Sequence, residues 1–316
     1  MISSRSFGFT MDALSDVLSL LKLRTYMVGG LDVGGDLSIQ FPAFEGLKCY
    51  AIMSGQGWLS VEGGSEPIKL TAGDCFLLPQ GRPFRLATDL TLPAIDGGKV
   101  FSQAGNGQVF THNGGGDCLV VAAHFNLIGR SADVLLEILP PIVQVLEDED
   151  KDEIRWCLDR LMRELRLPRP GGFLIAQQLC QMMLVQVLRV HVMTAADGRT
   201  GWLLALADKQ MNTALTAIHA SPAHRWTLNT LAEHAGLSRT TFAVKFKAMV
   251  GAPPMEYLAK WRMLVAGDKL MNSSESIGAI ASSLGYESSS AFSATFKRLM
   301  GCPPRDYRES VVGAPA

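Results

Sequence analysis

Hydroxyl, basic and small side chains recur at matching positions of two similar segments near the C-terminus. The first segment is SRTTFAVKFKAMVGAPP, residues 238–254, and the second is SSSAFSATFKRLMGCPP, residues 288–304. Both keep two Phe residues four positions apart, a Lys directly after the second Phe, and the sequence Gly-x-Pro-Pro. Hydroxyl groups form single hydrogen bonds and lysine binds phosphate. The chemistry available to these segments is therefore contact with a polyanion, and we predict no catalytic residue in them.

Two Phe residues at this spacing lie on one face of a helix and anchor it to a core. The positions of each helix that then face outward, before, between and after the two Phe residues, form the predicted binding residues. In the first segment these are Arg239, Thr240, Thr241, Ala243, Val244 and Lys247, and in the second Ser289, Ser290, Ser293, Ala294, Lys297 and Arg298. Among them Lys247, Lys297 and Arg298 suit phosphates, which position a protein without specifying sequence.

A short helix and a glycine turn are predicted before each of these helices. Leu231, Ala232 and Gly236 recur 49 residues later as Ile280, Ala281 and Gly285, so the second copy has one extra turn residue. This layout is the helix-turn-helix arrangement, over about 228–250 and 276–300. A helical-hairpin repeat without a nucleic-acid role is the alternative. The surrounding charge favours nucleic acid, because residues 225–309 hold 11 basic and 7 acidic side chains, against 18 and 23 elsewhere.

The linking segment and the two copies resemble one known family. A helix over about 255–271 would be about 25 Å long, comparable with one turn of DNA at roughly 34 Å. Residues 208–310, with SRTTFAVKFKAMVGAPPMEYLAKWRM, IASSLGYESSSAFSATFKRLMGCPPRDYR and HRWTLNTLAEHAGLS, resemble the AraC/XylS DNA-binding domain. The resemblance implies a bacterial, cytoplasmic transcription regulator that binds successive major grooves of double-stranded DNA, with RNA polymerase as a further partner. The family often has arginine at the positions of Val244 and Ala294, so less guanine-directed readout is expected here.

The N-terminal region has a different composition. Residues about 25–125 are rich in glycine and short apolar runs, which indicate short strands in a sandwich or barrel. The segments MDALSDVLSLLKLR and GQGWLSVEGGSEPIKLTAGDCFLLPQGRPFRL resemble the cupin-type ligand-binding domain of some AraC-type regulators. We therefore predict an α+β multidomain protein with a cupin-like effector-binding domain at 1–130. The candidate effector pocket consists of Tyr50, Trp58, Arg82, Phe84 and Arg85, with core packing and solvated surface as the alternative roles.

A metal ion or other cofactor is not expected. Tyr50 and Phe84 stand where metal-binding cupins have histidines, and His112 and His124 are not paired at short spacing. The six cysteines are scattered, which suggests reduced, buried residues. A metal-dependent cupin sensor or enzyme with an appended DNA-binding module remains the alternative function. A regulator controlled by protein contact without a ligand is a third.

The segment 131–200 is predicted to be a helical linker. Ile154, Leu158, Leu161, Met162 and Leu165 follow the period of an amphipathic helix, and FLIAQQLCQMMLVQVLRVHVM forms a second helix after LPRPGG. The second helix has more apolar surface than one core contact needs, which favours a homodimer through 153–194. No apolar run reaches the roughly 18 residues of a membrane span, and no export signal precedes the domain, so no membrane partner is expected.

Overall fold

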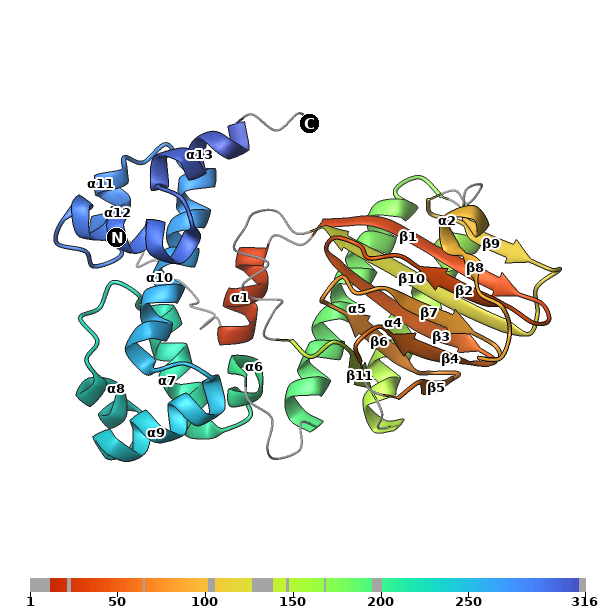
Figure 1. Cartoon of the computed structure of the whole chain (residues 1–316), viewed down its shortest axis with the longest axis horizontal. Coiled ribbons are helices and arrows are strands. Elements are labelled where there is room, and N and C mark those ends of the chain that lie inside the picture. Colours follow the sequence, from red (N-terminus) through yellow and green to blue (C-terminus); the bar gives the residue numbers. More distant parts are fainter. Residues whose placement is uncertain are drawn as a thin grey trace, which may run out of the picture. The chain divides into compact units, whose positions relative to one another are not determined.

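The described strands and helices fall into two compact units. The computed structural model describes residues 12–21, 24–64, 66–101, 106–126, 139–145, 148–167, 169–194 and 201–312. A strand-rich unit contains all the strands together with helices α2, α4 and α5, and a helical unit contains α1 and α6 to α13 (Figure 1). The predicted α+β multidomain fold is confirmed.

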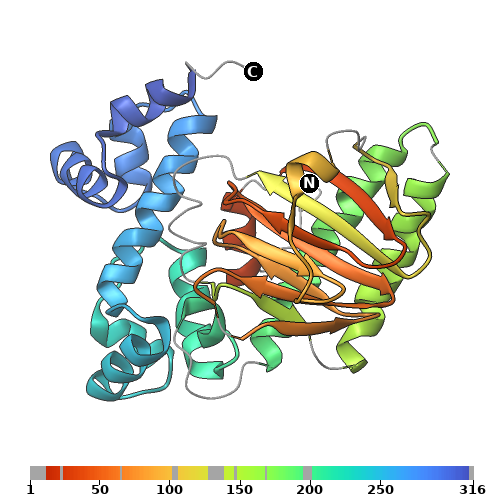
Figure 2. The same ribbon diagram turned by 45° about the vertical axis from the view of Figure 1, so that its right-hand side comes forward.

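Two sheets make up the strand-rich unit (Figures 1 and 2). The six-stranded sheet has the order β11-β6-β3-β10-β1-β9, and the five-stranded sheet has the order β5-β4-β7-β2-β8. The strands are β1 (Arg24–Val33), β2 (Ser38–Phe41), β3 (Leu47–Ser54), β4 (Gln56–Val61), β5 (Ile68–Thr71), β6 (Cys75–Leu78), β7 (Phe84–Ala87), β8 (Ile95–Asp96), β9 (Val109–His112), β10 (Cys118–Asn126) and β11 (Val143–Val145), with α2 (Gly97–Val100) after β8.

The core of this unit lies between the two sheets. Because side chains alternate along a strand, Tyr50 and Ile52 of β3 face inward and meet Phe84 of β7 and Phe41 of β2 in one apolar cluster. The Phe41 and Phe84 rings stack with centroids 4.5 Å apart. The interior is therefore apolar and rich in aromatic rings, as the sequence suggested for the cupin-like domain.

Helices α4 (Asp148–Arg166) and α5 (Gly172–Thr194) pack on each other, and α5 packs on β1, β6 and β11. The five apolar residues that predicted the first helix are all buried. One expectation needs correction: within the described part of the chain, Gly172–Val192 is long and apolar enough to cross a membrane. Scattered glutamines lower the mean hydropathy of that stretch only slightly, and 44% of its most apolar part is buried inside the protein.

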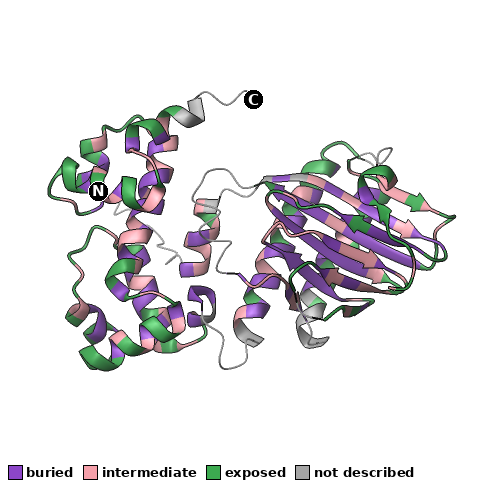
Figure 3. Cartoon of the chain, viewed as in Figure 1, coloured by how far each residue is buried: buried purple, intermediate pink, exposed green. Residues whose placement is uncertain are grey.

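The helical unit is built around one long helix, α10 (Pro254–Asn272). Besides α1, the other helices of the unit are α6 (Trp202–Ala205), α7 (Lys209–Ala220), α8 (Leu228–His234), α9 (Arg239–Val250), α11 (Ile277–Ser283), α12 (Ser289–Met300) and α13 (Pro304–Val312). Buried and exposed residues alternate along these helices with helical period (Figure 3).

The N-terminal helix α1 (Ala13–Leu21) belongs to the helical unit, where it contacts α7 and α10. Its Asp16 Oδ2 lies 3.7 Å from His219 Nδ1. The His219 ring stacks on Trp261 at 3.6 Å and its Nε2 lies 2.8 Å from the Tyr257 hydroxyl. Burial lowers the pKa of His219 to about 3. This neutral, stacked imidazole is a packing residue, and the helix that it holds lies within the range 1–130 that the sequence analysis assigned to the cupin-like domain.

Candidate nucleic-acid interface

Two helix-turn-helix units, α8–α9 and α11–α12, repeat the same construction. The first turn covers residues 235–238 and the second 284–288, so the second is one residue longer, as the sequence spacing indicated. Gly236 and Gly285 adopt φ values of +68° and +80°, where side chains other than glycine are strained. At Gly285 a Cβ atom would also lie 2.5 Å from the Ala223 carbonyl oxygen. The repeated glycine is therefore required by the bend.

Each short helix begins at a hydroxyl residue. Thr227, Ser238, Ser276 and Ser288 are N-caps whose side chains accept hydrogen bonds from backbone N–H groups of the first turn. Gly251 and Gly301 end α9 and α12 in the left-handed conformation. The residues shared by the two copies thus determine where α9 and α12, the two recognition helices, begin and end.

The outward faces of α9 and α12 correspond residue by residue. Phe242 and Phe246 are fully buried in α9, as are Phe292 and Phe296 in α12. The burial classes of residues 241–248 and 291–298 are identical. Exposed positions of the predicted binding set are Arg239, Thr240, Thr241, Val244, Lys247, Ser289, Ser290, Ala294, Lys297 and Arg298, and Ala243 and Ser293 are half-buried. At 66% exposure, Val244 is an apolar residue that the fold of the unit does not use.

Lys245 is a basic residue of α9 that is not available to a partner. Its Nζ lies 2.6 Å from Asp208 Oδ2 and donates to Gln210 Oε1 at 2.8 Å. Asp208 also caps the N-terminus of α7, and hydrogen bonds from Lys245 and from backbone N–H groups hold its pKa below the usual value despite burial. This ion pair fastens the first recognition helix to α7.

Arg262 of α10 connects the two helix-turn-helix units. Its Nε and a terminal nitrogen donate to the carbonyl oxygens of Pro222 (2.6 Å) and His224 (2.9 Å). The guanidinium lies 5.7 Å from the centre of the Tyr286 ring, in the second turn. Since α10 has 19 residues, it spans about 28 Å. Arg262 therefore fixes the loop of the first unit and the turn of the second against one rigid helix. Sequence reasoning missed it because its acceptors are backbone carbonyls.

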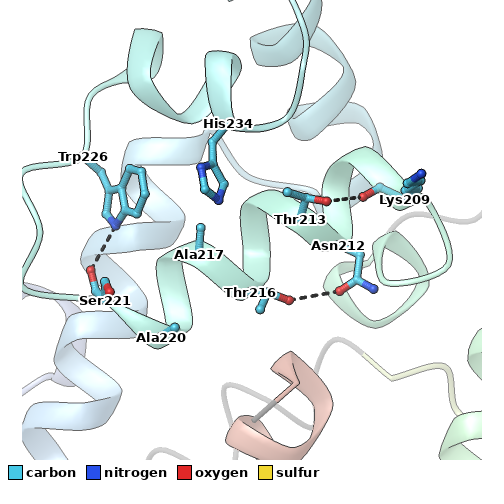
Figure 4. A pocket seen from close by; sticks show the side chains of 9 residues that line it. All are labelled: Lys209, Asn212, Thr213, Thr216, Ala217, Ala220, Ser221, Trp226 and His234. Carbon is cyan, nitrogen blue, oxygen red and sulfur yellow. Dashed lines mark hydrogen bonds between the residues drawn. The ribbon is translucent and has the colours of Figure 1, made fainter. Parts of the chain in front are cut away.

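An open hollow of about 550 Å³ lies on the first unit beside α7 (Figure 4). Its lining is Lys209, Asn212, Thr213, Thr216, Ala217, Ala220, Ser221, Trp226 and His234. The Trp226 indole N–H donates to the Ser221 carbonyl at 3.0 Å. No residue of α9 lines the hollow, so it is distinct from the predicted base-reading surface.

The structure brings together only two of the five candidate effector residues. Tyr50 and Phe84 lie in the core between the sheets with ring centroids 5.6 Å apart. Trp58 and Arg85 alternate with inward-facing Leu59 and Phe84, and so face the other side of their sheet. Arg85 donates from Nε to Ser38 Oγ at 2.7 Å.

Arg82 lies in the loop before β7 and donates to the Gly63 carbonyl oxygen at 2.9 Å. It is therefore not part of the cluster of Tyr50 and Phe84. Strand alternation was the signal that could have separated these residues in advance. The same alternation places Lys48 inward, on the face of Tyr50, and the sequence analysis did not single it out.

The described residues contain no cluster of three or more histidine, cysteine or acidic side chains placed to hold a metal ion. Five of the six cysteines are buried, and Cys302 is half-buried. Cys49 and Cys75 lie with Sγ atoms 3.8 Å apart. Burial raises the pKa of the Cys180 thiol to about 12.

Comparison with known proteins defines the class. Residues 12–193 match the cupin family and residues 231–310 match a helix-turn-helix domain family. A putative AraC-like transcription regulator of Streptomyces lividans is 41% identical over 300 residues, covering 95% of this chain and 98% of the relative. The chain therefore belongs to the AraC family of DNA-binding transcription regulators and carries an N-terminal cupin domain.

More distant relatives match either the whole chain or its DNA-binding domain. The transcriptional regulator AlkR of Acinetobacter baylyi is 27% identical over 308 residues, covering 95% of this chain and 99% of AlkR. Among solved structures, the DNA-binding domain of AdpA in complex with a target DNA is 29% identical, covering 33% of this chain and 92% of that chain, with a TM-score of 0.31. ToxT of Vibrio cholerae is 13% identical, covering 92% and 99%, with a TM-score of 0.37.

Proposed function

We propose that this regulator reads DNA with α9 and α12 in successive major grooves, and that a small molecule bound in the cupin domain modulates its affinity. The observation that carries the first half is the identical order of buried and exposed residues in 241–248 and 291–298, which leaves matching outward faces beside basic side chains. The proposed domains are 1–130 for effector binding, 131–200 for linkage and dimerisation, and 208–310 for DNA binding.

Lys247, Lys297 and Arg298 are the proposed phosphate contacts, because they are exposed and lie near the ends of their helices. Arg239, Thr240, Thr241, Ala243 and Val244 of α9, with Ser289, Ser290, Ser293 and Ala294 of α12, are the proposed base-reading residues. Val244 and Ala294 can contact thymine methyl groups but cannot form the two hydrogen bonds by which arginine reads guanine. DNA shape and backbone contacts then carry more of the specificity.

Selection of bound DNA from a random pool, at a stated salt concentration, tests this proposal. The expected result is a two-part site with parts about one helical turn apart and without a strongly conserved guanine under either helix. The variant Val244→Arg is the matched probe, and it should add a conserved guanine in one part only. A guanine-anchored site for the unaltered protein would contradict the proposed readout, and failure to select any DNA would contradict the proposed function.

Homodimerisation through α4 and α5 is the proposed assembly. Trp156 on α4 is 58% exposed and Leu174 on α5 is 61% exposed, and Phe173, Ile175 and Met182 are exposed on α5 as well. Several large exposed apolar side chains on one pair of packed helices favour an interface there. The experiment is sedimentation at micromolar concentration of the wild type and of Trp156→Glu/Leu174→Glu. A wild type that is monomeric throughout would contradict the proposal.

Effector control is thermodynamic in this proposal. A ligand that prefers one arrangement of the chain shifts the population that binds DNA, by no more than its difference in affinity for the two arrangements. The proposed setting is the bacterial cytoplasm, with RNA polymerase as a further partner and no catalytic activity. A regulator controlled by protein contact would show DNA binding that no small molecule alters, which a ligand screen on the selected DNA distinguishes.

A further inference from the structure

Lys48 is a charged side chain inside an apolar core. It lies on β3 with 8% of its surface exposed, directly opposite His124 of β10 and Leu78 of β6. Strand alternation places it on the face of Tyr50 and Ile52, which belong to the cluster between the two sheets. Lysine is rarely this buried, and the Lys48 ammonium keeps some contact with solvent, since Nζ is not among the fully buried unpaired atoms of the described residues.

Aromatic rings surround the ammonium group. Its Nζ lies 4.3 Å from the centre of the Phe44 ring, 5.3 Å from that of Phe84 and 5.5 Å from that of Phe41. Ring faces attract a cation but do not neutralise it. Among the described residues, no carboxylate and no hydrogen-bond acceptor pairs with Lys48. Burial lowers its pKa to about 8, so at neutral pH the group remains mostly charged.

Two polar groups lie beside the ammonium on the same inner face. The Tyr50 hydroxyl lies 3.3 Å from His124 Nε2. Burial and the charge of Lys48 lower the pKa of His124 to about 3, so its imidazole is neutral at physiological pH. The ammonium supplies a positive charge, and the mutually hydrogen-bonded Tyr50 and His124 supply polar surroundings, for a single negative charge set among aromatic rings. They match a ligand with one anionic end and an apolar body.

A carboxylate fits this environment better than a phosphate. A phosphate dianion needs several cations or N–H donors to offset the loss of its hydration, and here one ammonium faces aromatic carbon. A monocarboxylate needs one charge partner, and its hydrocarbon part can pack on Phe41, Phe44 and Phe84. The loop 42–46 beside this cluster is mostly exposed and contributes the half-buried Phe44 ring.

We propose that Lys48 is the anion-binding residue of the effector site and that the effector is a small carboxylate with an apolar body. The inference rests on the proposed effector control by the cupin domain. Tyr50 and His124 complete the polar end of this site, and Phe41, Phe44 and Phe84 form its walls. In this assignment the buried charge is kept for a ligand, which explains an ammonium that the fold itself leaves without a counter-ion.

The test uses the full chain and two variants, Lys48→Met and Lys69→Met. Methionine keeps the length and apolar stem of lysine, and Lys69 is an exposed lysine of β5 in the same unit. The probes are butanoate, hexanoate, octanoate and benzoate, each beside the alcohol with the same carbon skeleton. Binding is measured by calorimetric titration and by the shift in melting temperature at neutral pH. At least one carboxylate should bind the wild type and Lys69→Met equally, and Lys48→Met about tenfold or more weakly.

Lys48→Arg, which keeps the charge, should retain more carboxylate binding than Lys48→Met. Equal carboxylate binding by wild type and Lys48→Met would overturn the assignment, as would the absence of binding by every carboxylate. The wild type and Lys69→Met are also assayed on the selected DNA with and without each probe. A wild type that binds no DNA contradicts the proposed function. A wild type that binds DNA and responds to an alcohol, but to no carboxylate, overturns only the role of Lys48.

Discussion

The helical unit and the strand-rich unit each bury a cation, but the two cations have opposite surroundings. In the helical unit, half-buried Arg262 donates to two backbone carbonyl oxygens and lies over the Tyr286 ring. In the strand-rich unit, Lys48 is more deeply buried and has three aromatic rings but no acceptor among the described residues. Both groups lose hydration, but only Arg262 replaces the lost hydrogen bonds within the protein.

This difference separates a structural cation from a functional one. A cation that the fold needs is hydrogen-bonded, so its removal leaves acceptors unpaired and lowers stability. A cation kept for a ligand lowers the stability of the empty protein, so its removal raises stability. Substitutions at the two positions should therefore change the free energy of unfolding in opposite directions.

The largest effect is expected for Arg262→Met. It removes two charge-assisted hydrogen bonds that hold the loop 222–224 to α10, and solvent can replace part of them, so about 1–3 kcal/mol of stability should be lost. Because the loop and the second turn set the spacing of the recognition helices, affinity for the selected DNA should fall about tenfold or more. The dependence of affinity on salt should stay unchanged, since no phosphate contact is removed. Urea unfolding and DNA titration at several salt concentrations measure these quantities.

Lys260→Met on the same helix is the matched control. Lys260 pairs with Glu256 at 3.0 Å on an exposed surface, and such pairs contribute little. It should leave both stability and DNA affinity close to those of the wild type. If Arg262→Met also left stability and DNA affinity unchanged, Arg262 would have no role in positioning the two helix-turn-helix units.

The opposite sign is expected for Lys48→Met. Its removal should raise the free energy of unfolding by about 1–3 kcal/mol at neutral pH, because an uncompensated charge leaves the core. The unfolded chain holds this proton up to a pKa of 10.5, and the folded protein only up to about 8. The free energy of unfolding of the wild type therefore rises between pH 8 and 10.5, as Lys48 loses its proton. Below pH 8 the cost of burying the charged ammonium is present in full.

Chemical unfolding of wild type and Lys48→Met across that range measures the difference. It should be largest at neutral pH and shrink above pH 8, where His124 is already neutral. Taking the difference between the two proteins cancels other groups that titrate in the same range. A variant less stable than the wild type at neutral pH would place Lys48 with Arg262 among the structural cations.

The sequence predicted the architecture of the helical unit better than its internal contacts. The repeated Phe pairs and glycines indicated both helix-turn-helix units, because those residue types have few other uses at that spacing. Arg262 and Lys245 could not be recognised, since the acceptors of Arg262 are carbonyls far along the chain and Lys245 pairs with Asp208, the N-cap of α7. The position of α1 against α7 and α10 also has no local signal, because an amphipathic helix can pack on either unit.

In the strand-rich unit the sequence analysis did not establish which side of its sheet each candidate side chain faces. The composition predicted strands and an aromatic interior, but Trp58 and Arg85 were chosen by residue type without testing the alternation along their strands. Leu59 and Phe84 face the core, so their neighbours in sequence cannot. The same test applied to LKCYAIMS would have placed Lys48 beside Tyr50. The loop that covers an inward-facing lysine is determined by packing between segments far apart in the sequence. It therefore could not be predicted from the local sequence pattern.

A smaller effect is expected for the exposed lysines of the recognition helices. Lys247→Ala and Lys297→Ala should each weaken binding a few-fold and by a similar factor on all DNA sequences, because phosphate contacts carry no sequence information. Each should reduce the slope of log affinity against log salt by about 1. Titrations at several salt concentrations measure the slope, with Lys260→Met again as the control. An unchanged slope would remove that lysine from the phosphate-binding set.

The smallest effect is expected for Arg225→Ala, which tests whether an exposed cation matters as little as the comparison of buried cations implies. Arg225 and Glu287 join the two helix-turn-helix units at 2.9 Å, as Arg262 does, but their side chains are 85% and 81% exposed. An exposed pair is hydrated in both states, so its loss should change stability by less than about 0.5 kcal/mol and DNA affinity less than twofold. Unfolding and DNA titration beside Arg262→Met measure both. A loss as large as that of Arg262→Met would mean that connection between the units, rather than burial of the hydrogen bonds, determines their stability.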